Sequence, residues 1–82
     1  MIKIFTKKDC PLCPGAKELG QKLLEKGKNV EYFDIDTASG LAEASFYTVM
    51  STPTIVLSDQ SGDEINSWRG EVPILSNILQ DC

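Results

Sequence analysis

A segment with the periodicity of an amphipathic helix, residues 14–26, lies between two short apolar runs, and this arrangement restricts the fold more than any other feature. Its apolar and small residues recur at helical spacing: Ala16, Leu19, Gly20, Leu23 and Leu24. Gly27 follows, where helices commonly end in a left-handed residue. The flanking runs, 2–5 and 30–35, are rich in the β-branched and aromatic residues of strands. The chain therefore predicts a βαβ unit, with two parallel strands joined by a right-handed crossover.

The rest of the chain predicts a second helix, two more strands and a third helix. N-cap and turn residues at 36–40 precede a weaker helical stripe, which comprises Leu41, Ala44, Ser45, Thr48 and Val49. An apolar run at 55–57 has an expected antiparallel partner at 64–68. The last helix is expected to begin near Pro73, with an apolar face of Ile74, Leu75, Ile78 and Leu79. The order β-α-β-α-β-β-α predicts one α/β domain, residues 1–82, whose four-stranded mixed sheet is flanked by helices.

Composition narrows the class of protein. Apolar residues form 41% and charged residues 24% of the chain, which is typical of a folded domain. The formal net charge of −4 argues against binding to nucleic acid or to anionic membranes. The sequence has neither an apolar run near the ~20 residues of a membrane span nor a signal-peptide pattern, so we expect a cytoplasmic protein. We also expect a monomer. Phe46, Tyr47 and Trp68 are expected in or beside the core.

Two cysteines three positions apart, Cys10 and Cys13, lie where the first strand gives way to the first helix. The unpaired N–H groups and the dipole at a helix N-terminus stabilise a thiolate and lower its pKa. The amides of Leu12 and Cys13 can point at the Cys10 sulfur, whereas Pro11 has no N–H. Because Cys10 precedes the helix, we expect it to be the more exposed nucleophile, with Cys13 as a shielded resolving thiol.

The residues on either side of the cysteine pair raise two local questions. Two lysines and an aspartate at 7–9 either place a positive potential on Cys10 or are merely solvated loop charges; the sequence leaves both open. Pro14 disfavours helical geometry at the residue before it, so we expect the helix to start at Pro14 with Cys13 as its N-cap. A start at Pro11 would instead bring the Pro14 ring against the Cys10 carbonyl.

Three motifs in order, rather than any one alone, make the chain similar to a known family. They are Cys10-Pro11-Leu12-Cys13 after the first strand, Thr52-Pro53-Thr54 before the third, and Gly70 before the last helix. Over essentially all 82 residues the chain resembles the thioredoxin superfamily, specifically its small glutaredoxin-like branch. The resemblance implies a thioredoxin-like fold, a cis bond before Pro53, and disulfide exchange at the two cysteines. It also implies that Thr52 and Pro53 bind the incoming disulfide peptide, with Pro11 and Leu12 completing the substrate-binding set.

The stretch before the last helix bears on the reductant. Glutathione-dependent glutaredoxins typically carry a glycine pair and acidic residues there, whereas residues 68–73 read Trp-Arg-Gly-Glu-Val-Pro. Leu12 also replaces the tyrosine that is common between the cysteines. The Trp-x-Gly pattern is similar to that of redoxins that serve ribonucleotide reductase and are recycled by a thioredoxin-reductase-type flavoenzyme. We therefore expect no bound cofactor, protein disulfides as substrates, ribonucleotide reductase as one candidate partner, and electrons from a flavoprotein disulfide reductase ahead of glutathione.

Two alternatives belong to other functional classes. Cys10 and Cys13 are two of the four ligands that structural zinc or an iron–sulfur cluster needs; the chain has no histidine and only Cys82 besides, so such a site requires a dimer. A non-catalytic binding module on the same fold is the other alternative. With three cysteines, one must stay unpaired within the chain, and Cys82 is expected to be an incidental surface thiol.

Overall fold

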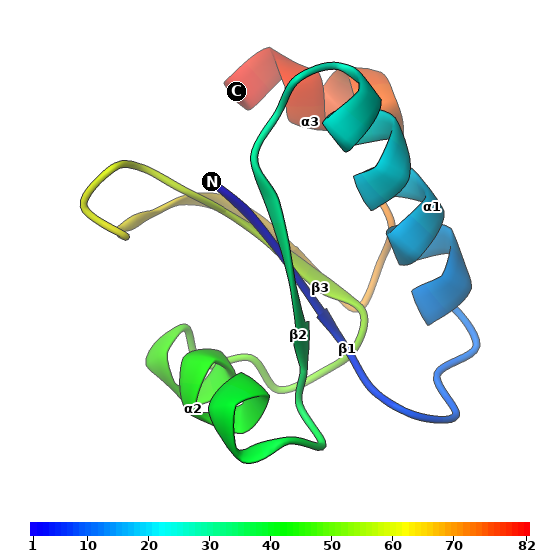
Figure 1. Ribbon diagram of the computed structural model, residues 1–82, viewed down its shortest axis with the longest axis vertical. Helices are drawn as coiled ribbons and strands as arrows, with labels where there is room; N and C mark the ends of the chain where they lie inside the picture. The colour runs from blue at the N-terminus through cyan, green and yellow to red at the C-terminus, as the bar shows by residue number, and fades with distance from the viewer.

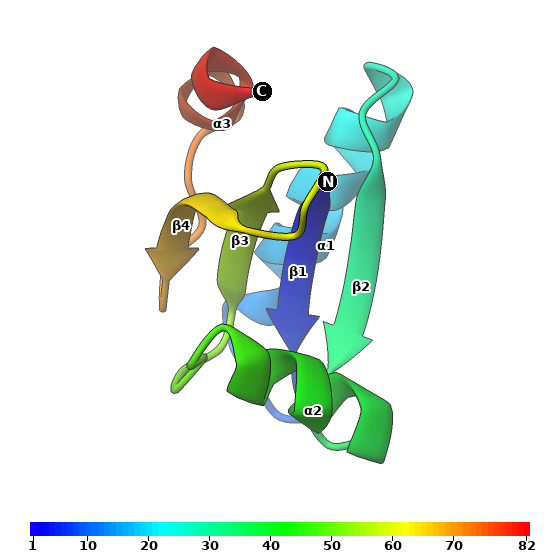
Figure 2. The same cartoon turned by 90° about the vertical axis from the view of Figure 1, so that its left-hand side faces the viewer.

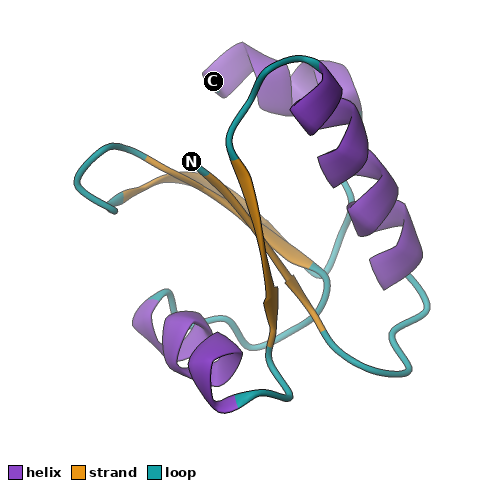
Figure 3. Cartoon of the chain, viewed as in Figure 1, coloured by secondary structure: helices purple, strands orange, loops and turns teal.

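A four-stranded sheet with helices on both faces forms the centre of the molecule (Figures 1 and 3). The computed structural model describes residues 1–82. Its elements are β1 (Ile2–Thr6), α1 (Cys13–Glu25), β2 (Val30–Asp34), α2 (Ala38–Phe46), β3 (Thr54–Ser58), β4 (Glu64–Arg69) and α3 (Leu75–Asp81). The strand order is β2-β1-β3-β4; β1 and β2 are parallel, and the other pairs are antiparallel. The expected fold class and the βαβ unit are confirmed.

The sheet separates two apolar clusters. Figure 2 shows α1 behind the sheet and α2 in front of it, while α3 packs against α1. Because side chains alternate along a strand, Ile2 and Ile4 of β1 face α1, whereas Phe5 faces α2. The larger cluster contains Ile2, Ile4, Ala16, Leu19, Leu23, Ile55, Leu57 and Ile78; the smaller contains Phe5, Ala44, Tyr47 and Val56. The two clusters hold the central strands β1 and β3 from both sides.

Lys3 is a charged residue on the face of β1 that packs against α2. Its side chain is only 14% exposed, and its ammonium forms an ion pair with Glu43 of α2. The ammonium also lies 4.9 Å from the ring centroid of Tyr47 and 5.7 Å from that of Phe33. Burial lowers the pKa of Lys3, but hydrogen bonding and charge interactions with Glu43 and Tyr47 outweigh burial, so the pKa is raised above the ordinary value of 10.5.

The first helix buries most of the predicted stripe. Ala16, Leu19, Gly20 and Leu23 are buried, whereas Leu24 is 42% exposed and lies outside the packed face. At the C-terminal end Gly27 adopts a φ of +79°, and the Lys28 N–H bonds the Leu23 carbonyl at 3.0 Å. This is the left-handed glycine cap that the sequence predicts.

The second helix packs through small residues rather than through the predicted stripe. It begins at Ala38, with the Thr37 hydroxyl accepting from the Gly40 N–H at 3.0 Å. Gly40 and Ala44 face the sheet, whereas Leu41 is 55% exposed and the stripe prediction is wrong there. The reason is close approach: a Cβ atom on Gly40 would collide with the backbone carbonyl of Asp34. A helix this near the sheet has no room for a leucine.

The last helix begins at Leu75 rather than near Pro73. Pro73 is buried in the preceding loop, and Ile74, the N-cap, is 64% exposed instead of joining the apolar face. Ile78 is the fully buried residue of this helix. None of the helices has the length and apolar character that a bilayer crossing requires.

The aromatic residues behave differently from one another. Tyr47 is 6% exposed and Trp68 packs against the larger cluster, as expected. Phe46 is 70% exposed, so the prediction that it belongs to the core is wrong. Phe46 is the last residue of α2 and stacks only edge-on against its neighbour, Tyr47, at 4.8 Å between ring centroids.

Candidate active site

The two N-terminal cysteines form a disulfide at the start of α1. Cys10 and Cys13 are bonded through sulfur, with Cα atoms 5.3 Å apart. Cys13 is only 3% exposed, whereas Cys10 is half-buried and Pro11 and Leu12 between them are exposed. The expected difference in exposure is confirmed: a reagent from solvent meets Cys10 first.

The helix starts one residue earlier than predicted. Cys13 is its first residue and Leu12 its N-cap, so Pro14 occupies the second helical position. Proline is tolerated there because the first N–H groups of a helix have no intrahelical acceptor. Cys10 lies outside the helix, so its carbonyl does not have to share a helical turn with the Pro14 ring. Instead, the Cys10 carbonyl accepts the Cys13 N–H at 3.2 Å. The Cys13 amide is thereby engaged, contrary to our expectation, while the Leu12 N–H has no acceptor in the protein.

The loop that leads into Cys10 is fixed by local geometry. Asp9 adopts a left-handed φ of 56°, a conformation that aspartate tolerates better than most residues. The Lys8 N–H donates to the carboxylate of Asp36, just after β2, at 3.0 Å. These two features anchor the loop to the neighbouring strand and bring Cys10 back to the helix N-terminus.

An open hollow of about 580 Å³ surrounds the disulfide. Its lining consists of Lys7, Lys8, Asp9, Cys10, Pro11, Cys13, Pro14 and Lys17. The two loop lysines therefore line the same hollow as the cysteines, with exposed side chains. Lys17 was not predicted as a site residue; its position four residues after Cys13, one helical turn further on, is the signal that could have identified it.

The segment before β3 lies at the same end of the sheet as the disulfide. Phe5 of β1 pairs with Thr54 of β3, so the end of β1 and the beginning of β3 are adjacent. Both views place the beginning of β3 beside the beginning of α1 (Figures 1 and 2). The Thr52–Pro53 bond is cis, as the resemblance implied, and Pro53 is buried. The backbone N–H and C=O of Thr52 make no hydrogen bond to the rest of the chain, and its buried hydroxyl also lacks a partner.

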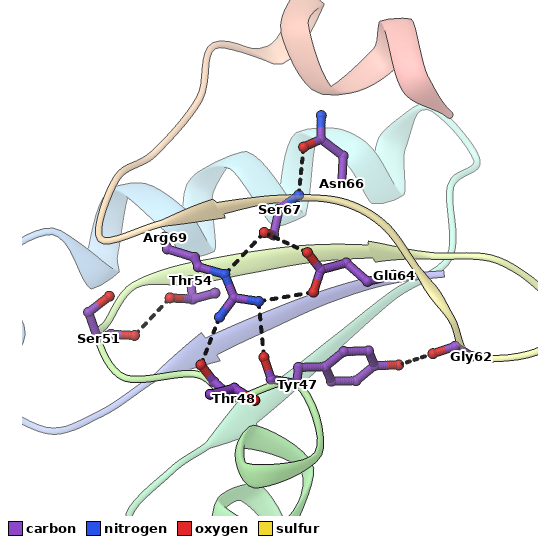
Figure 4. A network of polar contacts seen from close by, with 9 residues as sticks. All are labelled: Tyr47, Thr48, Ser51, Thr54, Gly62, Glu64, Asn66, Ser67 and Arg69. Carbon is purple, nitrogen blue, oxygen red and sulfur yellow. Dashed lines mark hydrogen bonds and ion pairs between the residues drawn. The ribbon is translucent and has the colours of Figure 1, made fainter.

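The end of β4 holds this segment in place, a feature that the sequence analysis missed. The Gly70 N–H donates to the Pro53 carbonyl at 2.8 Å, and Gly70 has the left-handed φ of +73° that favours glycine. The guanidinium of Arg69 donates to the carbonyls of Thr48 at 2.9 Å and Tyr47 at 3.0 Å (Figure 4). The connector 47–53 between α2 and β3 is thus bound near both of its ends.

Arg69 also has partners on its own strand. One of its nitrogens lies 2.9 Å from a carboxylate oxygen of Glu64, and its Nε–H donates to the Ser67 hydroxyl at 3.1 Å (Figure 4). These contacts orient the guanidinium toward the carbonyl end of α2, where a positive charge is favourable. A planar side chain with five N–H donors suits this arrangement, which lysine could not reproduce.

A cysteine pair that forms a disulfide at a helix N-terminus is typical of thiol–disulfide exchange proteins, and comparisons with known proteins agree. A family model of the thioredoxin domain matches residues 1–80. A protein of Archaeoglobus fulgidus described as a probable thioredoxin is 33% identical over 61 residues, covering 73% of this chain and 67% of the relative. The chain therefore belongs to the thioredoxin family.

Solved structures agree on the fold. Thioredoxin 1 of Thermosipho africanus TCF52B superposes with a TM-score of 0.79 at 18% identity, covering 98% of this chain and 86% of that one, a likeness that concerns the fold alone. A thioredoxin of Thermus thermophilus gives a TM-score of 0.68 at 27% identity, covering 98% of this chain and 68% of that one.

Family membership together with the Cys10–Cys13 disulfide makes the protein a thiol–disulfide oxidoreductase. The family implies disulfide-containing proteins as substrates and a reductase as electron donor.

The remaining cysteine lies elsewhere. Cys82 is exposed and unpaired, as expected, and it lines a different hollow together with residues of the chain's N-terminus. No group of three or more His, Cys, Asp or Glu side chains is placed to hold a metal ion. The assignment to a glutaredoxin-like branch within the superfamily stays a prediction.

Proposed function

We propose that this protein reduces protein disulfides through Cys10 as nucleophile and Cys13 as resolving thiol, and that a thioredoxin-reductase-type flavoenzyme returns it to the dithiol state. The observation that carries the proposal is the unequal exposure of the two sulfurs at the N-terminus of α1. The partly exposed Cys10 can reach a substrate, whereas Cys13, at 3% exposure, can reach only a disulfide already attached to Cys10.

The reaction has two exchange steps that move two electrons. The Cys10 thiolate attacks one sulfur of the substrate disulfide; a Cys10–substrate disulfide forms, and the other substrate sulfur leaves as a thiolate that takes a proton from water. Cys13 loses its proton to solvent and attacks the Cys10 sulfur, which releases the second substrate thiolate. The Cys10–Cys13 disulfide that results is the state seen in the structure. The unpaired Leu12 N–H at the helix N-terminus supports the Cys10 thiolate in the reduced form.

The substrate-binding role of Thr52 is supported by its free backbone groups. An extended peptide can pair with both the N–H and the C=O of Thr52, because neither is used within the protein. Buried Pro53 fixes the position of the Thr52 backbone. Exposed Pro11 and Leu12 provide apolar contact on the other side of Cys10. The substrate peptide would then lie across the beginning of β3 with its disulfide above Cys10.

The choice of reductant rests on the segment between β4 and α3. The first turn of α3 carries no acidic residue, and the one glycine there, Gly70, has its N–H engaged by Pro53. The glycine pair and the acidic pair that are typical of the glutathione site in glutaredoxins are not found here, since the segment has one glycine and one acidic residue, Glu71. The Archaeoglobus fulgidus relative is described as a probable thioredoxin, which also favours a reductase of the thioredoxin type. Because the pair must be returned to the dithiol form after each cycle, we propose a reducing compartment, the cytoplasm, as its location.

Coupled assays test the reductant. Oxidation of NADPH is followed with a peptide disulfide as substrate, either with thioredoxin reductase or with glutathione and glutathione reductase. We expect turnover in the first system. Turnover only in the second would refute the proposed reductant while leaving the disulfide chemistry in place.

Cysteine variants test the assigned roles. Cys10→Ser should abolish peptide disulfide reduction, and Cys13→Ser should accumulate a mixed disulfide, seen by mass spectrometry as the protein plus one substrate half. Cys82→Ser is the matched control and should keep full activity, because Cys82 is exposed and remote from the hollow around Cys10. Full activity in Cys10→Ser would show that the assignment is wrong.

A further inference from the structure

Positive charge gathers around the disulfide of a protein that is negative overall. Lys7 and Lys8 in the loop and Lys17 on α1 line the hollow, and Asp9 is the single acidic residue in that lining. The lining therefore has a net charge of +2, whereas the whole chain has −4, so the rest of the chain carries −6. The charge of the site is opposite to that of its surroundings.

The three lysines are free to act on a partner. The ion pairs of the structure are Lys3–Glu43, Lys22–Glu18 and Arg69–Glu64, and none involves the hollow. All three lysines of the hollow are exposed. The nearby Asp36 carboxylate accepts the backbone N–H of Lys8. The ammonium groups thus lack a partner within 4 Å, and their potential extends into the solvent in front of Cys10.

We propose that this hollow makes the protein select disulfides flanked by acidic residues. The inference deepens the proposed function, on which it rests, by naming the substrate class. A local field of one sign raises the rate of encounter with partners of the opposite sign, and salt screens this effect over ~8–10 Å at physiological ionic strength. The remaining −6 repels acidic partners from other faces, so the approach of an acidic segment is directed to the disulfide.

The rate of peptide reduction tests the inference. The reduced protein is mixed with three oxidised peptides of equal length whose disulfides have acidic, neutral or basic flanks, and acid-quenched samples are analysed by mass spectrometry. At low salt the acidic peptide should react about tenfold faster than the neutral one, and the basic peptide more slowly. At about 0.5 M salt the three rates should agree within about twofold.

Two variants, one on α1 and one at the residue that follows it, locate the effect. Lys17→Gln should lower the acidic-to-neutral rate ratio about threefold at low salt, because one of the three positive charges of the hollow is lost. Lys26→Gln makes the same change in net charge at the far end of α1 and should leave every rate unchanged. An equal fall in both variants would show that only total charge matters and would overturn the assignment to the hollow.

The outcomes separate this inference from the proposed function. If the protein reduces all three peptides at equal rates at low salt, or if their ratio is insensitive to salt, the inference is refuted and the disulfide chemistry stands. If it reduces none of them, the proposed function itself fails.

Discussion

Replacing Arg69 by methionine should loosen the connector 47–53, which contains the proposed substrate-binding residue Thr52. The substitution keeps most of the aliphatic stem and removes the guanidinium. Two carbonyls at the C-terminal end of α2, those of Tyr47 and Thr48, then lose their charged donor, and Glu64 loses its ion-pair partner. The hydrogen bond from the N–H of Gly70, the residue after β4, to the Pro53 carbonyl is left to hold this connector.

The expected loss of stability is about 2–3 kcal/mol. Hydrogen bonds to charged groups contribute ~1.5–3 kcal/mol when well shielded. The Arg69 side chain is 36% exposed, so we assign about 1 kcal/mol to each of its two carbonyl contacts. The ion pair with Glu64, which is equally exposed, adds less than about 1 kcal/mol. For a domain of this size the sum corresponds to a fall in Tm of about 8–24 °C.

Thermal unfolding of the oxidised protein, followed by circular dichroism, measures the effect. Two controls divide it into parts: Glu64→Gln removes only the ion-pair charge and should cost less than about 1 kcal/mol, and Arg69→Lys should recover part of the loss. In a coupled assay at a temperature where both proteins are folded, Arg69→Met should raise KM for the peptide disulfide several-fold more than it lowers kcat. A Tm within about 2 °C of the wild type, with an unchanged KM, would refute the proposal that Arg69 holds the connector 47–53 in place.

Two further predictions concern packing and charge. Gly40→Ala should lower the free energy of unfolding by about 1–4 kcal/mol, since its Cβ meets the Asp34 carbonyl and overpacking outweighs the gain in helix propensity. In Gly15→Ala the new Cβ meets only Val72, at 3.9 Å, so this control should gain up to ~1 kcal/mol; equal effects in urea unfolding would contradict the reasoning. Lys3→Met should be less stable than the wild type at neutral pH, with a difference that shrinks above pH 10.5. The raised pKa of Lys3 means that its stabilising contribution is present below that value and is lost as the pH rises through the folded-state pKa; a difference that persists unchanged in strong alkali would contradict this.

The large-scale fold could be predicted because strand and helix periodicities are long and regular. The stripe of α1 and the glycine after it specify the crossover, and the cysteines follow from their position between β1 and that helix. The second helix was harder, because the apolar-stripe criterion favours large side chains. Leu41 satisfied the criterion and is exposed, whereas Gly40 contributes nothing to a hydrophobic stripe and makes the closest contact with the sheet.

The surroundings of the site depend on tertiary contacts that no local pattern encodes. Arg69 lies more than twenty residues along the chain from the carbonyls that it binds, so only the folded structure shows these hydrogen bonds. Lys17 lines the hollow because it lies about one helical turn after Cys13, on the same side of α1. The start of α1 was misplaced by one residue because the preference against helical geometry before proline is a tendency, which the turn from Cys13 to the Cys10 carbonyl overcomes here.

The pairing of Phe5 with Thr54 has a consequence for how such a protein can diverge. This pairing of two buried residues fixes the distance between the loop that holds Cys10 and the backbone of Thr52. The geometry of the exchange site therefore depends on the core of the protein. The three lysines of the hollow project from exposed positions that support no part of that core. A descendant lineage can therefore exchange one set of partners for another by altering surface charge alone, while its electron-transfer chemistry passes on unchanged.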